Sequence, residues 1–337
     1  MRIKDIGEER LIRDLAQRFS SAHPRLIKAI GDDTSVSTQK KGMSLLATTD
    51  LLIEGTHFIS SRTTAYLLGR KSLSISLSDI AAMGGRPLFY LVSVALPPQT
   101  KKAFVDELYE GLSACASEFG AHLAGGNTAA AEKIMVSTTV IGEADPKRVV
   151  YRSGAEAGDI IYVTGTLGDS ALGLEVLMKN SLNKAMRGRW AASVKRHLDP
   201  TPRMSAGDLL AKGGLASAMM DISDGLGLDL ERLCAQSRVS AIVERELLPV
   251  SNELIGYASG SEETIIRLAV SGGEDYELLF TSPELNSERI RRLAKKLSTP
   301  ITRIGRITGP EKSRKRVSFI DGSGRPIRIK KTGFVHF

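Results

Sequence analysis

The sequence predicts an α/β protein of two domains, and three observations support this fold class. The chain has 337 residues, which is enough for two domains and a large core. Short apolar runs typical of buried strands alternate along it with amphipathic helical patterns. Residues 143–158 combine Asp-Pro with two glycines, as expected for a crossing between domains. We therefore expect an N-terminal domain over residues 1–145, a sheet with flanking helices, and a C-terminal α/β domain over residues 146–337.

The first half of the chain is expected to open with a helix and then to read β, α, β, α, β, β. The opening helix places Leu11, Leu15 and Phe19 on one face. Helices are expected over residues 8–19, 64–84 and 101–119, and strands over residues 45–50, 89–95, 121–124 and 135–141. A loop over residues 50–58 should follow the first strand, and a glycine-rich turn over residues 125–128 should follow the third.

The second half is expected to alternate strands with helices before a basic, β-rich tail. Strands are expected over residues 160–164, 218–221, 278–281 and 301–307, and helices over residues 171–179, 184–197, 203–212, 225–236 and 288–297. The turn over residues 165–170 leads into a helix whose N-terminus is suited to an anion. Asp224 is placed to cap the N-terminus of the helix over residues 225–236.

The charge of the chain is positive, with 46 Lys and Arg against 38 Asp and Glu, a net charge of +8. Ten of the basic residues lie in residues 303–331, a density that suits nucleic acid or an anionic small substrate. Aromatic residues make up only 5% of the chain, and no alternation of basic and aromatic residues predicts a stacking platform for bases. Nucleic acid is therefore not expected as the partner.

The cysteines and the apolar runs predict a cytoplasmic protein. Cys115 and Cys234 are distant in sequence and neither belongs to a CxxC pair, which is typical of a reducing compartment and argues against a structural zinc site. The first residues lack the apolar core of a signal peptide. The longest apolar run, near residues 88–96, is too short to span a bilayer.

Acidic, amide and hydroxyl side chains recur where predicted strands and helices end. The segments that share this property are residues 31–33 (Gly-Asp-Asp), 48–50 (Thr-Thr-Asp), 78–79 (Ser-Asp), 125–128 (Gly-Gly-Asn-Thr) and 221–225 (Asp-Ile-Ser-Asp-Gly). Hard cations such as Mg²⁺ take oxygen ligands of this kind, and paired glycines let backbone N–H groups approach a phosphate. Each segment alone is also typical of a surface turn. Together they predict one site for several metal ions and phosphate.

In their order and wording these segments resemble the thiamine-monophosphate kinase family, in the superfamily shared with aminoimidazole ribonucleotide synthetase, selenophosphate synthetase and a hydrogenase-maturation ATPase. The resemblance also includes residues 152–155, 163–170, 271–277 and 333–337, so that it covers nearly the whole chain. It implies a two-domain aminoimidazole ribonucleotide synthetase-like fold and a homodimer formed through the N-terminal sheets. It implies transfer of the γ-phosphate of ATP to thiamine monophosphate, with several Mg²⁺ ions and ATP as co-substrate.

The resemblance also assigns roles to individual residues. It implies metal ligands at Asp33, Thr48, Thr49, Asp50, Asp79, Asn127, Asp221 and Asp224, with Asp32 as a direct or indirect partner, nucleotide contacts at Gly126, Asn127, Arg152 and Ser223, and thiamine-side contacts at His57, Glu274 and Phe334. Asp50 and Asp79 are expected to matter most. No general base is expected, because the acceptor phosphate is already ionised. Many relatives carry Asp where this chain has Asn127, and a neutral oxygen binds a cation more weakly.

Other functions remain open at the level of the sequence. A different ATP-dependent ligase of the same superfamily is one, although selenophosphate synthetase is disfavoured because no Cys lies in the N-terminal region. A Walker-type kinase is disfavoured because GxxxxGK[ST] is absent. A nucleotide-binding protein without turnover and an RNA-binding protein that uses residues 303–331 are the alternatives from other classes.

Overall fold

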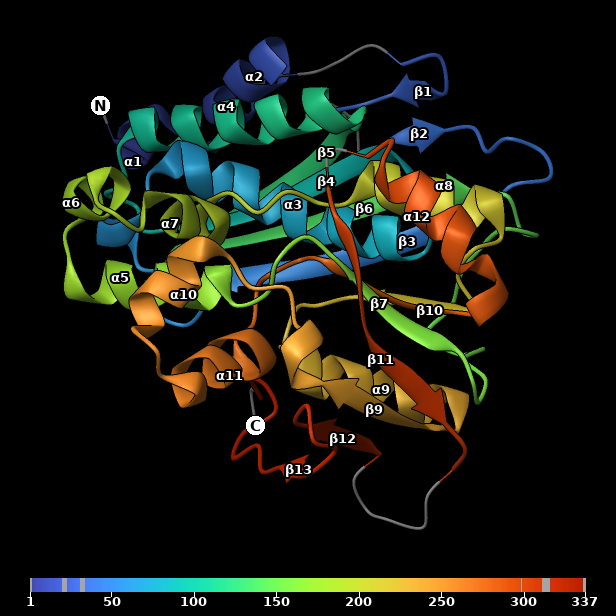
Figure 1. Ribbon diagram of the computed structural model, residues 1–337. Helices are drawn as coiled ribbons and strands as arrows, with labels where there is room; N and C mark the ends of the chain where they lie inside the picture. The colour runs from blue at the N-terminus through green and yellow to red at the C-terminus, as the bar shows by residue number, and fades with distance from the viewer. Residues whose placement is uncertain (1, 20–22, 31–33, 298, 311–315, 336–337) are drawn as a thin grey trace. The chain divides into compact units, whose positions relative to one another are not determined.

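The computed structural model describes residues 2–19, 23–30, 34–297, 299–310 and 316–335 (Figure 1). The chain divides into two compact units: unit 1 is Met1–Ile80 with Gly85–Pro146, and unit 2 is Ala81–Gly84 with Lys147–Phe337. The division after Pro146 lies one residue from the predicted boundary. The assignment of Ala81–Gly84 to unit 2 was not indicated by the sequence, because these residues end a helix whose body belongs to unit 1.

Unit 1 is built on a four-stranded sheet. Its elements are α1 (Ile3–Ile6), α2 (Glu8–Phe19), β1 (Leu26–Lys28), β2 (Val36–Ser37), β3 (Ser44–Ile53), α3 (Ala65–Ala82), β4 (Arg86–Leu96), α4 (Lys102–Phe119), β5 (His122–Ala130) and β6 (Met135–Ala144). The strand order is β3-β6-β4-β5. β6 pairs antiparallel with β3 and β4, whereas β4 and β5 are parallel. Parallel neighbours need a crossover connection, and α4 supplies it.

Helix α3 covers one face of this sheet, and the opposite face is open along β3. The hydroxyl of Thr138 on β6 donates to the carbonyl of Ser72 on α3 at 2.6 Å and lies 2.8 Å from the hydroxyl of Ser76. Helix α4 packs directly on α3, where a Cβ on Gly69 would stand 2.0 Å from a carbonyl oxygen of α4 (Figure 1). On the opposite face Leu45 and Leu51 of β3 are 55% and 47% exposed.

Two of the predicted strand boundaries in unit 1 are wrong. β3 pairs with β6 at every residue from Ser44 to Ile53, so Asp50 lies inside a strand and not at the start of a loop. β5 likewise continues through the predicted glycine-rich turn to Ala130. A Cβ at Gly126 would lie 2.0 Å from the carbonyl oxygen of Val92 on β4, so glycine here permits close strand pairing. In both strands ladder pairing outweighs the weak strand propensity of Gly, Asn and Asp.

Unit 2 is built on a seven-stranded sheet flanked by helices. Its elements are β7 (Ile160–Thr164), α5 (Asp169–Lys179), α6 (Leu182–Arg187), α7 (Ala191–Leu198), α8 (Met204–Gly213), β8 (Ala218–Asp221), α9 (Leu226–Ser237), β9 (Ser240–Glu244), α10 (Asn252–Ala258), α11 (Glu262–Ser271), β10 (Leu278–Ser282), α12 (Ser287–Ala294), β11 (Ile301–Thr308), β12 (Val317–Ile320) and β13 (Pro326–Ile327). The strand order is β13-β12-β9-β11-β7-β10-β8, and among the described residues of this sheet only β12 and β9 pair parallel.

Both faces of the larger sheet are buried. Ile161 of β7 belongs to one core with Leu230 of α9, whereas its neighbour Tyr162 belongs to a second core with Leu210 of α8. Successive strand residues point to opposite faces, and this alternation explains why β7 and β10 are buried along their whole length. The sheet therefore holds the loops at its strand ends on a rigid base.

Unit 2 differs from the sequence prediction in two ways. The helix predicted over residues 184–197 is two helices, α6 and α7, which are separated at Gly188. Strand β9 and helices α10 and α11 were not predicted. Ser251 and Ser261 begin these two helices by accepting hydrogen bonds from Leu254 N and Thr264 N, so serine caps were the available signal. No helix in the described parts of the chain is long and apolar enough to cross a membrane.

Candidate active site

Asp50 and Asp79, the two acids expected to matter most, lie close together in unit 1. Asp50 comes from β3 and Asp79 from α3. The hydroxyl of Thr48 on β3 donates to Asp79 Oδ2 at 2.5 Å, and the hydroxyl of Ser76 on α3 donates to Asp50 Oδ2 at 2.7 Å. Each carboxylate is therefore oriented by a hydroxyl group from the element that carries the other.

The electrostatics of this pair favour a cation. Burial, and then the charge of Asp79, raise the pKa of Asp50 to about 6, while the hydrogen bond from Ser76 acts in the opposite direction. Two carboxylates and a threonine hydroxyl form a set of hard oxygen donors, which is the chemistry that Mg²⁺ selects. The described residues contain no cluster of three or more His, Cys, Asp and Glu placed to hold a metal. Two further predicted acids, Asp32 and Asp33, lie outside the described residues.

Thr49 and Asn127 are not brought together with Asp50. Thr49 points to the open face of the sheet, because neighbouring strand residues alternate, and its hydroxyl lies 3.0 Å from that of Thr139. Asn127 is on β5, at the other edge of the sheet. Asn127 is in register with Ser93, whereas the cross-strand row that contains Asp50 reaches β5 at Gly126. Within one chain the side chains of these two residues therefore do not converge with Asp50, and the metal-binding roles of Thr49 and Asn127 stay predictions.

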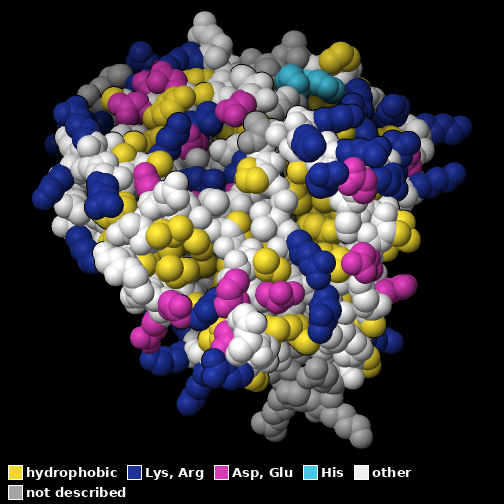
Figure 2. Space-filling model, in the orientation of Figure 1, with side chains coloured by type: hydrophobic (Ala, Val, Ile, Leu, Met, Phe, Trp, Pro, Cys, Tyr) yellow, Lys and Arg dark blue, Asp and Glu magenta, His cyan; other side chains and the backbone are white. Residues whose placement is uncertain are grey.

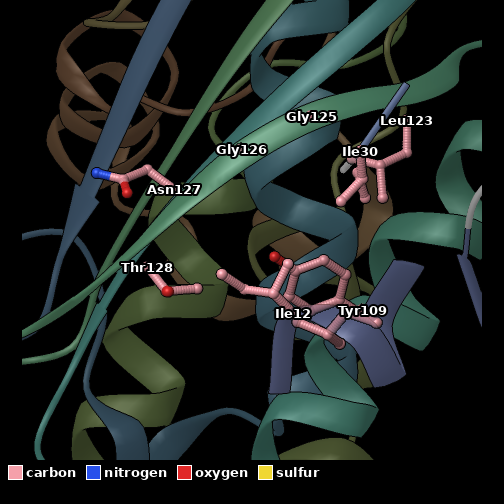
Figure 3. Close-up of a pocket in the computed structure, with 9 residues that line it drawn as sticks. Ile12, Ile30, Tyr109, Leu123, Gly125, Gly126, Asn127 and Thr128 are labelled. Atoms are coloured by element: carbon pink, nitrogen blue, oxygen red, sulfur yellow. The ribbon is translucent and has the colours of Figure 1, made fainter. Parts of the chain in front are cut away.

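A pocket in unit 1 lies beside β5 (Figure 3). Its lining residues come from β5, α2, α4 and the segment before residue 31, and they are Ile12, Leu15, Ile30, Tyr109, Leu123, Gly125, Gly126, Asn127 and Thr128. In Figure 3 the side chain of Thr128 extends towards Ile12, whereas that of Asn127 points to the other side of the strand. An aromatic ring with aliphatic walls beside an exposed glycine backbone suits a flat heterocycle. Gly126, predicted to contact nucleotide, is part of this pocket.

His57 closes the turn that follows β3. Its ring Nδ1 accepts a hydrogen bond from Ile53 N at 3.1 Å, and its own backbone N–H donates to Ile53 O at 2.9 Å. When the ring is neutral, its proton is therefore on Nε2. The role of His57 in substrate binding stays a prediction.

In unit 2 the loop between β8 and α9 is held by a single buried carboxylate. Asp229 Oδ2 accepts the backbone N–H groups of Ser223, Asp224 and Gly225 at 3.1, 3.0 and 3.1 Å. Asp229 is fully buried, and burial raises its pKa to about 6 although these bonds and Arg232 favour the charged form. The predicted cap at Asp224 is therefore wrong: the cap comes from the first turn of the helix itself, which leaves the Asp224 carboxylate available for other contacts.

We expect Asp229→Ala to destabilise the protein more than Asp229→Asn, by about 1–3 kcal/mol in the free energy of unfolding. Alanine leaves three backbone N–H groups without their acceptor, whereas asparagine retains one oxygen at that position. Urea denaturation of both variants measures the difference. Equal losses in the two variants would show that the loop does not depend on this acceptor.

The same loop organises two predicted substrate residues through its carbonyl groups. Glu274 N donates to Ser223 O at 2.7 Å, and Phe334 N donates to Asp224 O at 2.9 Å. Glu274 has a φ of 63°, in the left-handed region that non-glycine residues rarely adopt, and such strain is typical of functional sites. Gly273 allows the close approach, since a Cβ there would lie 2.7 Å from Ser223 O. Ser223, Asp224, Glu274 and Phe334 thus share one part of unit 2.

Glu274, Asp221 and Arg152 complete the description of the predicted residues in this unit. The Glu274 carboxylate lies 3.3 Å from Nδ1 of His197, a buried residue of α7. Asp221, at the end of β8, is 3% exposed. The side chain of Arg152 is exposed, and its carbonyl oxygen accepts a hydrogen bond from Ser237 at 3.2 Å.

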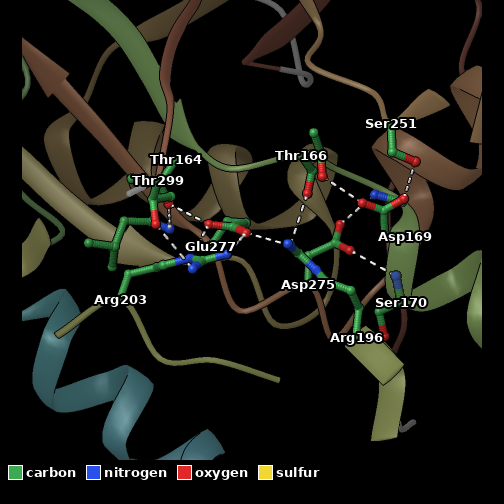
Figure 4. Close-up of polar contacts among 12 residues, drawn as sticks. Thr164, Thr166, Asp169, Ser170, Arg196, Arg203, Ser251, Asp275, Glu277 and Thr299 are labelled. Atoms are coloured by element: carbon green, nitrogen blue, oxygen red, sulfur yellow. Dashed lines mark hydrogen bonds and ion pairs between the residues drawn. The ribbon is translucent and has the colours of Figure 1, made fainter. Parts of the chain in front are cut away.

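The sequence did not predict a buried charged network next to the loop between β8 and α9 (Figure 4). Glu277, which is fully buried, accepts hydrogen bonds from Arg196, Arg203 and Thr164 at 2.5–2.7 Å. Asp275 accepts the backbone N–H groups of Gly168 and Ser170 at 2.7 and 3.2 Å. Burial raises the pKa of Asp275 to about 8, against the effect of these bonds.

The N-terminus of α5, expected to suit an anionic ligand, is therefore occupied by the carboxylate of Asp275.

The basic segment over residues 303–331 is partly neutralised by acids. Lys330 pairs with Glu263 at 2.9 Å and Arg325 with Asp321 at 3.3 Å. On the face shown in Figure 2, Asp and Glu side chains are interspersed among Lys and Arg.

The fold and these sites define an AIR synthase-related protein. The family described as AIR synthase related protein, N-terminal domain, matches residues 31–144, and the family described as AIR synthase related protein, C-terminal domain, matches residues 156–318.

Relatives of known name narrow this class. The thiamine-monophosphate kinase of Aquifex aeolicus is 36% identical over 337 residues, which is 100% of both chains. The crystal structure of thiamine-monophosphate kinase from Stenotrophomonas maltophilia K279a has a TM-score of 0.81 and 32% identity, and covers 91% of this chain and 94% of that chain. AaThiL complexed with AMPPCP and TMP has a TM-score of 0.77 and 36% identity, and covers 100% of this chain and 99% of that chain. The chain belongs to the thiamine-monophosphate kinase family.

Proposed function

We propose that this protein transfers the γ-phosphoryl group of ATP to the phosphate of thiamine monophosphate. The bond between the γ-phosphorus and its bridging oxygen breaks, a bond from that phosphorus to an acceptor phosphate oxygen forms, and the products are thiamine diphosphate and ADP. The observation that carries the proposal is the full-length similarity to AaThiL, a protein solved with AMPPCP, an analogue of ATP, and TMP.

In unit 1, Asp50 and Asp79 are proposed to hold Mg²⁺ together with Thr48, because these oxygens converge and repel each other without a cation. Mg²⁺ would neutralise the charge between two anionic substrates and stabilise the charge that spreads over the transferring group. Asp33, which lies outside the described residues, is proposed as a further ligand. Several ions are expected, because donor and acceptor carry phosphate.

The pocket beside β5 is proposed to bind the purine base of ATP. Tyr109 and Ile12 supply apolar walls, and Gly126 leaves the backbone accessible on one side. Asn127 and Thr49 face away from Asp50. We therefore propose that each contacts ATP or a metal ion separately from Asp50. The base would thus be held by β5, while the acid pair lies on β3 and α3.

In unit 2 the loop after β8 is proposed to bind metal and phosphate on its side-chain surface. Asp221 and Asp224 supply carboxylates, Ser223 a hydroxyl, and Arg152 a guanidinium for phosphate. On the backbone side the loop positions Glu274 and Phe334 for thiamine. A carboxylate and an aromatic face suit a cationic heterocycle. His57 in unit 1 is proposed as another thiamine contact.

The direct test is product formation by the purified protein. Incubation with ATP, Mg²⁺ and thiamine monophosphate should yield ADP and thiamine diphosphate in equal amounts, and EDTA should abolish both. ADP released without thiamine diphosphate would support a different ATP-dependent enzyme of the superfamily. Binding of ATP with neither product would support a nucleotide-binding protein without turnover. We expect this activity in the cytoplasm.

We also propose that the protein forms a homodimer through the open face of the four-stranded sheet. Leu45 and Leu51 project from this face and are about half exposed. Exposed leucines on one face of a sheet are typical of an interface. The resemblance to the family supports the same arrangement.

Leu51→Asp should convert a dimer into a monomer in sedimentation velocity, because a carboxylate would be buried without a partner. Leu285→Asp is the matched control, since Leu285 is an exposed leucine of unit 2, 82% accessible, and its replacement should leave the oligomeric state unchanged. A monomeric wild-type protein, or a Leu51→Asp variant that still dimerises, would contradict the proposed interface.

A further inference from the structure

Arg232 bridges two acids at the loop that follows β8. Its Nη1 donates to Asp224 Oδ2 at 2.5 Å and to Asp229 Oδ1 at 2.8 Å. It comes from α9, two turns into the helix that the loop begins. Arg232 is 41% exposed, Asp224 23% and Asp229 0%. The guanidinium therefore lies at the surface of unit 2 and reaches inward to one fully buried carboxylate.

The two acids have different roles in this arrangement. Asp229 is committed to structure, because its other oxygen accepts three backbone N–H groups of the loop. The Asp224 carboxylate makes no such bonds in the described parts of the chain, and Arg232 is its ion-pair partner there. Asp224 is also the residue of this pair that the proposed function assigns to a metal ion.

A divalent cation at Asp224 would lie within a few ångströms of the Arg232 guanidinium. Arginine stays charged in proteins, so the two cations repel and compete for the same carboxylate. We propose that Arg232 is the resident counter-cation of Asp224: it neutralises Asp224 while no metal is bound, and a divalent cation must displace it. This inference rests on the proposed function only for the assignment of Asp224 to a metal.

The competition also favours one form of the incoming metal. A bare cation meets the full repulsion of Arg232, whereas a cation that carries the phosphates of a nucleotide brings negative charge that the guanidinium attracts. Arg232 should therefore weaken binding of the free ion and leave binding of the metal–nucleotide complex much less affected. The loop would then be filled by metal and nucleotide together.

The test is a titration of the purified protein with Mn²⁺, followed by the electron paramagnetic resonance signal of the free ion, without ATP or thiamine monophosphate. Arg232→Met keeps the length of the side chain but removes its charge, and should tighten Mn²⁺ binding at Asp224 by about 5- to 30-fold. Arg232→Lys keeps the charge and should stay closer to wild type. In the presence of AMPPCP the difference between Arg232→Met and wild type should shrink.

Two controls make the result specific. In an Asp224→Asn background, Arg232→Met should have no effect on Mn²⁺ binding. Arg267→Met removes the same charge from a different ion pair, with Glu175 at 2.7 Å, and should leave Mn²⁺ binding unchanged. Thermal melting establishes that each variant is folded.

Unchanged Mn²⁺ affinity in folded Arg232→Met, or an effect that persists without Asp224, would overturn the inference. The titration contains neither substrate, so its outcome is independent of whether thiamine diphosphate is formed. The wild-type protein could make thiamine diphosphate while the Arg232→Met variant has unchanged Mn²⁺ affinity. That result would refute the role of Arg232 as counter-cation and support the kinase activity.

Discussion

Asp50→Asn should lower the rate of thiamine diphosphate formation by a factor of about 10³ or more and leave the protein folded. The amide matches the shape of the carboxylate and can still accept the hydrogen bond from Ser76. It removes one of the two charges that hold a cation between ATP and the acceptor phosphate. Steady-state rates with saturating Mg²⁺ measure the loss.

The same substitution should stabilise the metal-free protein at neutral pH, by about 1–3 kcal/mol. Folding raises the pKa of Asp50 to about 6, from about 3.9 in an unfolded chain. The folded state therefore binds more protons between these values, and the stability of the wild type falls as pH rises from about 4 to 6. Asp50→Asn should lack this part of the pH dependence.

Thermal melting at pH 4.5 and 7.5 in EDTA checks the effect on stability, and the two proteins should differ more at pH 7.5. A variant that is less stable than wild type at pH 7.5 would show that the Asp50–Asp79 pair is not in electrostatic conflict. Near-wild-type turnover by Asp50→Asn would remove Asp50 from the catalytic site.

Glu277→Gln should have the largest effect on stability, a loss of about 3–5 kcal/mol in the free energy of unfolding of unit 2. Glu277 is fully buried between Arg196 and Arg203, and removing its charge takes from both guanidinium groups the carboxylate that they share. For a unit of this size the midpoint of thermal unfolding should fall by about 6–20 °C.

Glu288→Gln is the matched control for this prediction. Glu288 also pairs with two arginines, Arg291 and Arg292, but its side chain is 49% exposed, and water screens such pairs. Its replacement should leave the midpoint unchanged within error. Equal shifts of the midpoint for Glu277→Gln and Glu288→Gln would mean that burial does not determine how much the Glu277 ion pairs contribute to stability.

The described structure brings predicted residues together in two places, and each has a physical reason. Thr48 and Asp50 meet Asp79 because residues two apart on a strand share a face. Ser223, Asp224, Glu274 and Phe334 meet because the carbonyl groups of one loop accept from two distant segments.

The residues that support these sites were harder to find in the sequence. Ser76 precedes Asp79 by three positions, a helical spacing that places both on one side of α3. A serine in an apolar helix does not by itself indicate which residue it binds. Asp229 lies in the first turn of α9, where an acid is expected to meet free N–H groups. Glu277 gave no local signal, since Arg196 and Arg203 are 81 and 74 residues away.

The sequence by itself determined the α/β class, most helices and strands, and the family, because apolar periodicity and ordered motifs are local properties of the chain. The tertiary structure alone decided which of the predicted site residues have side chains on the same face of a strand or loop. Register in the four-stranded sheet places Asp50 on the helix-covered face and Thr49 on the open face. The β8–α9 loop acquires its shape from Asp229, and Asp224 acquires Arg232 as its partner. Such assignments depend on strand pairing and burial, which no single segment encodes.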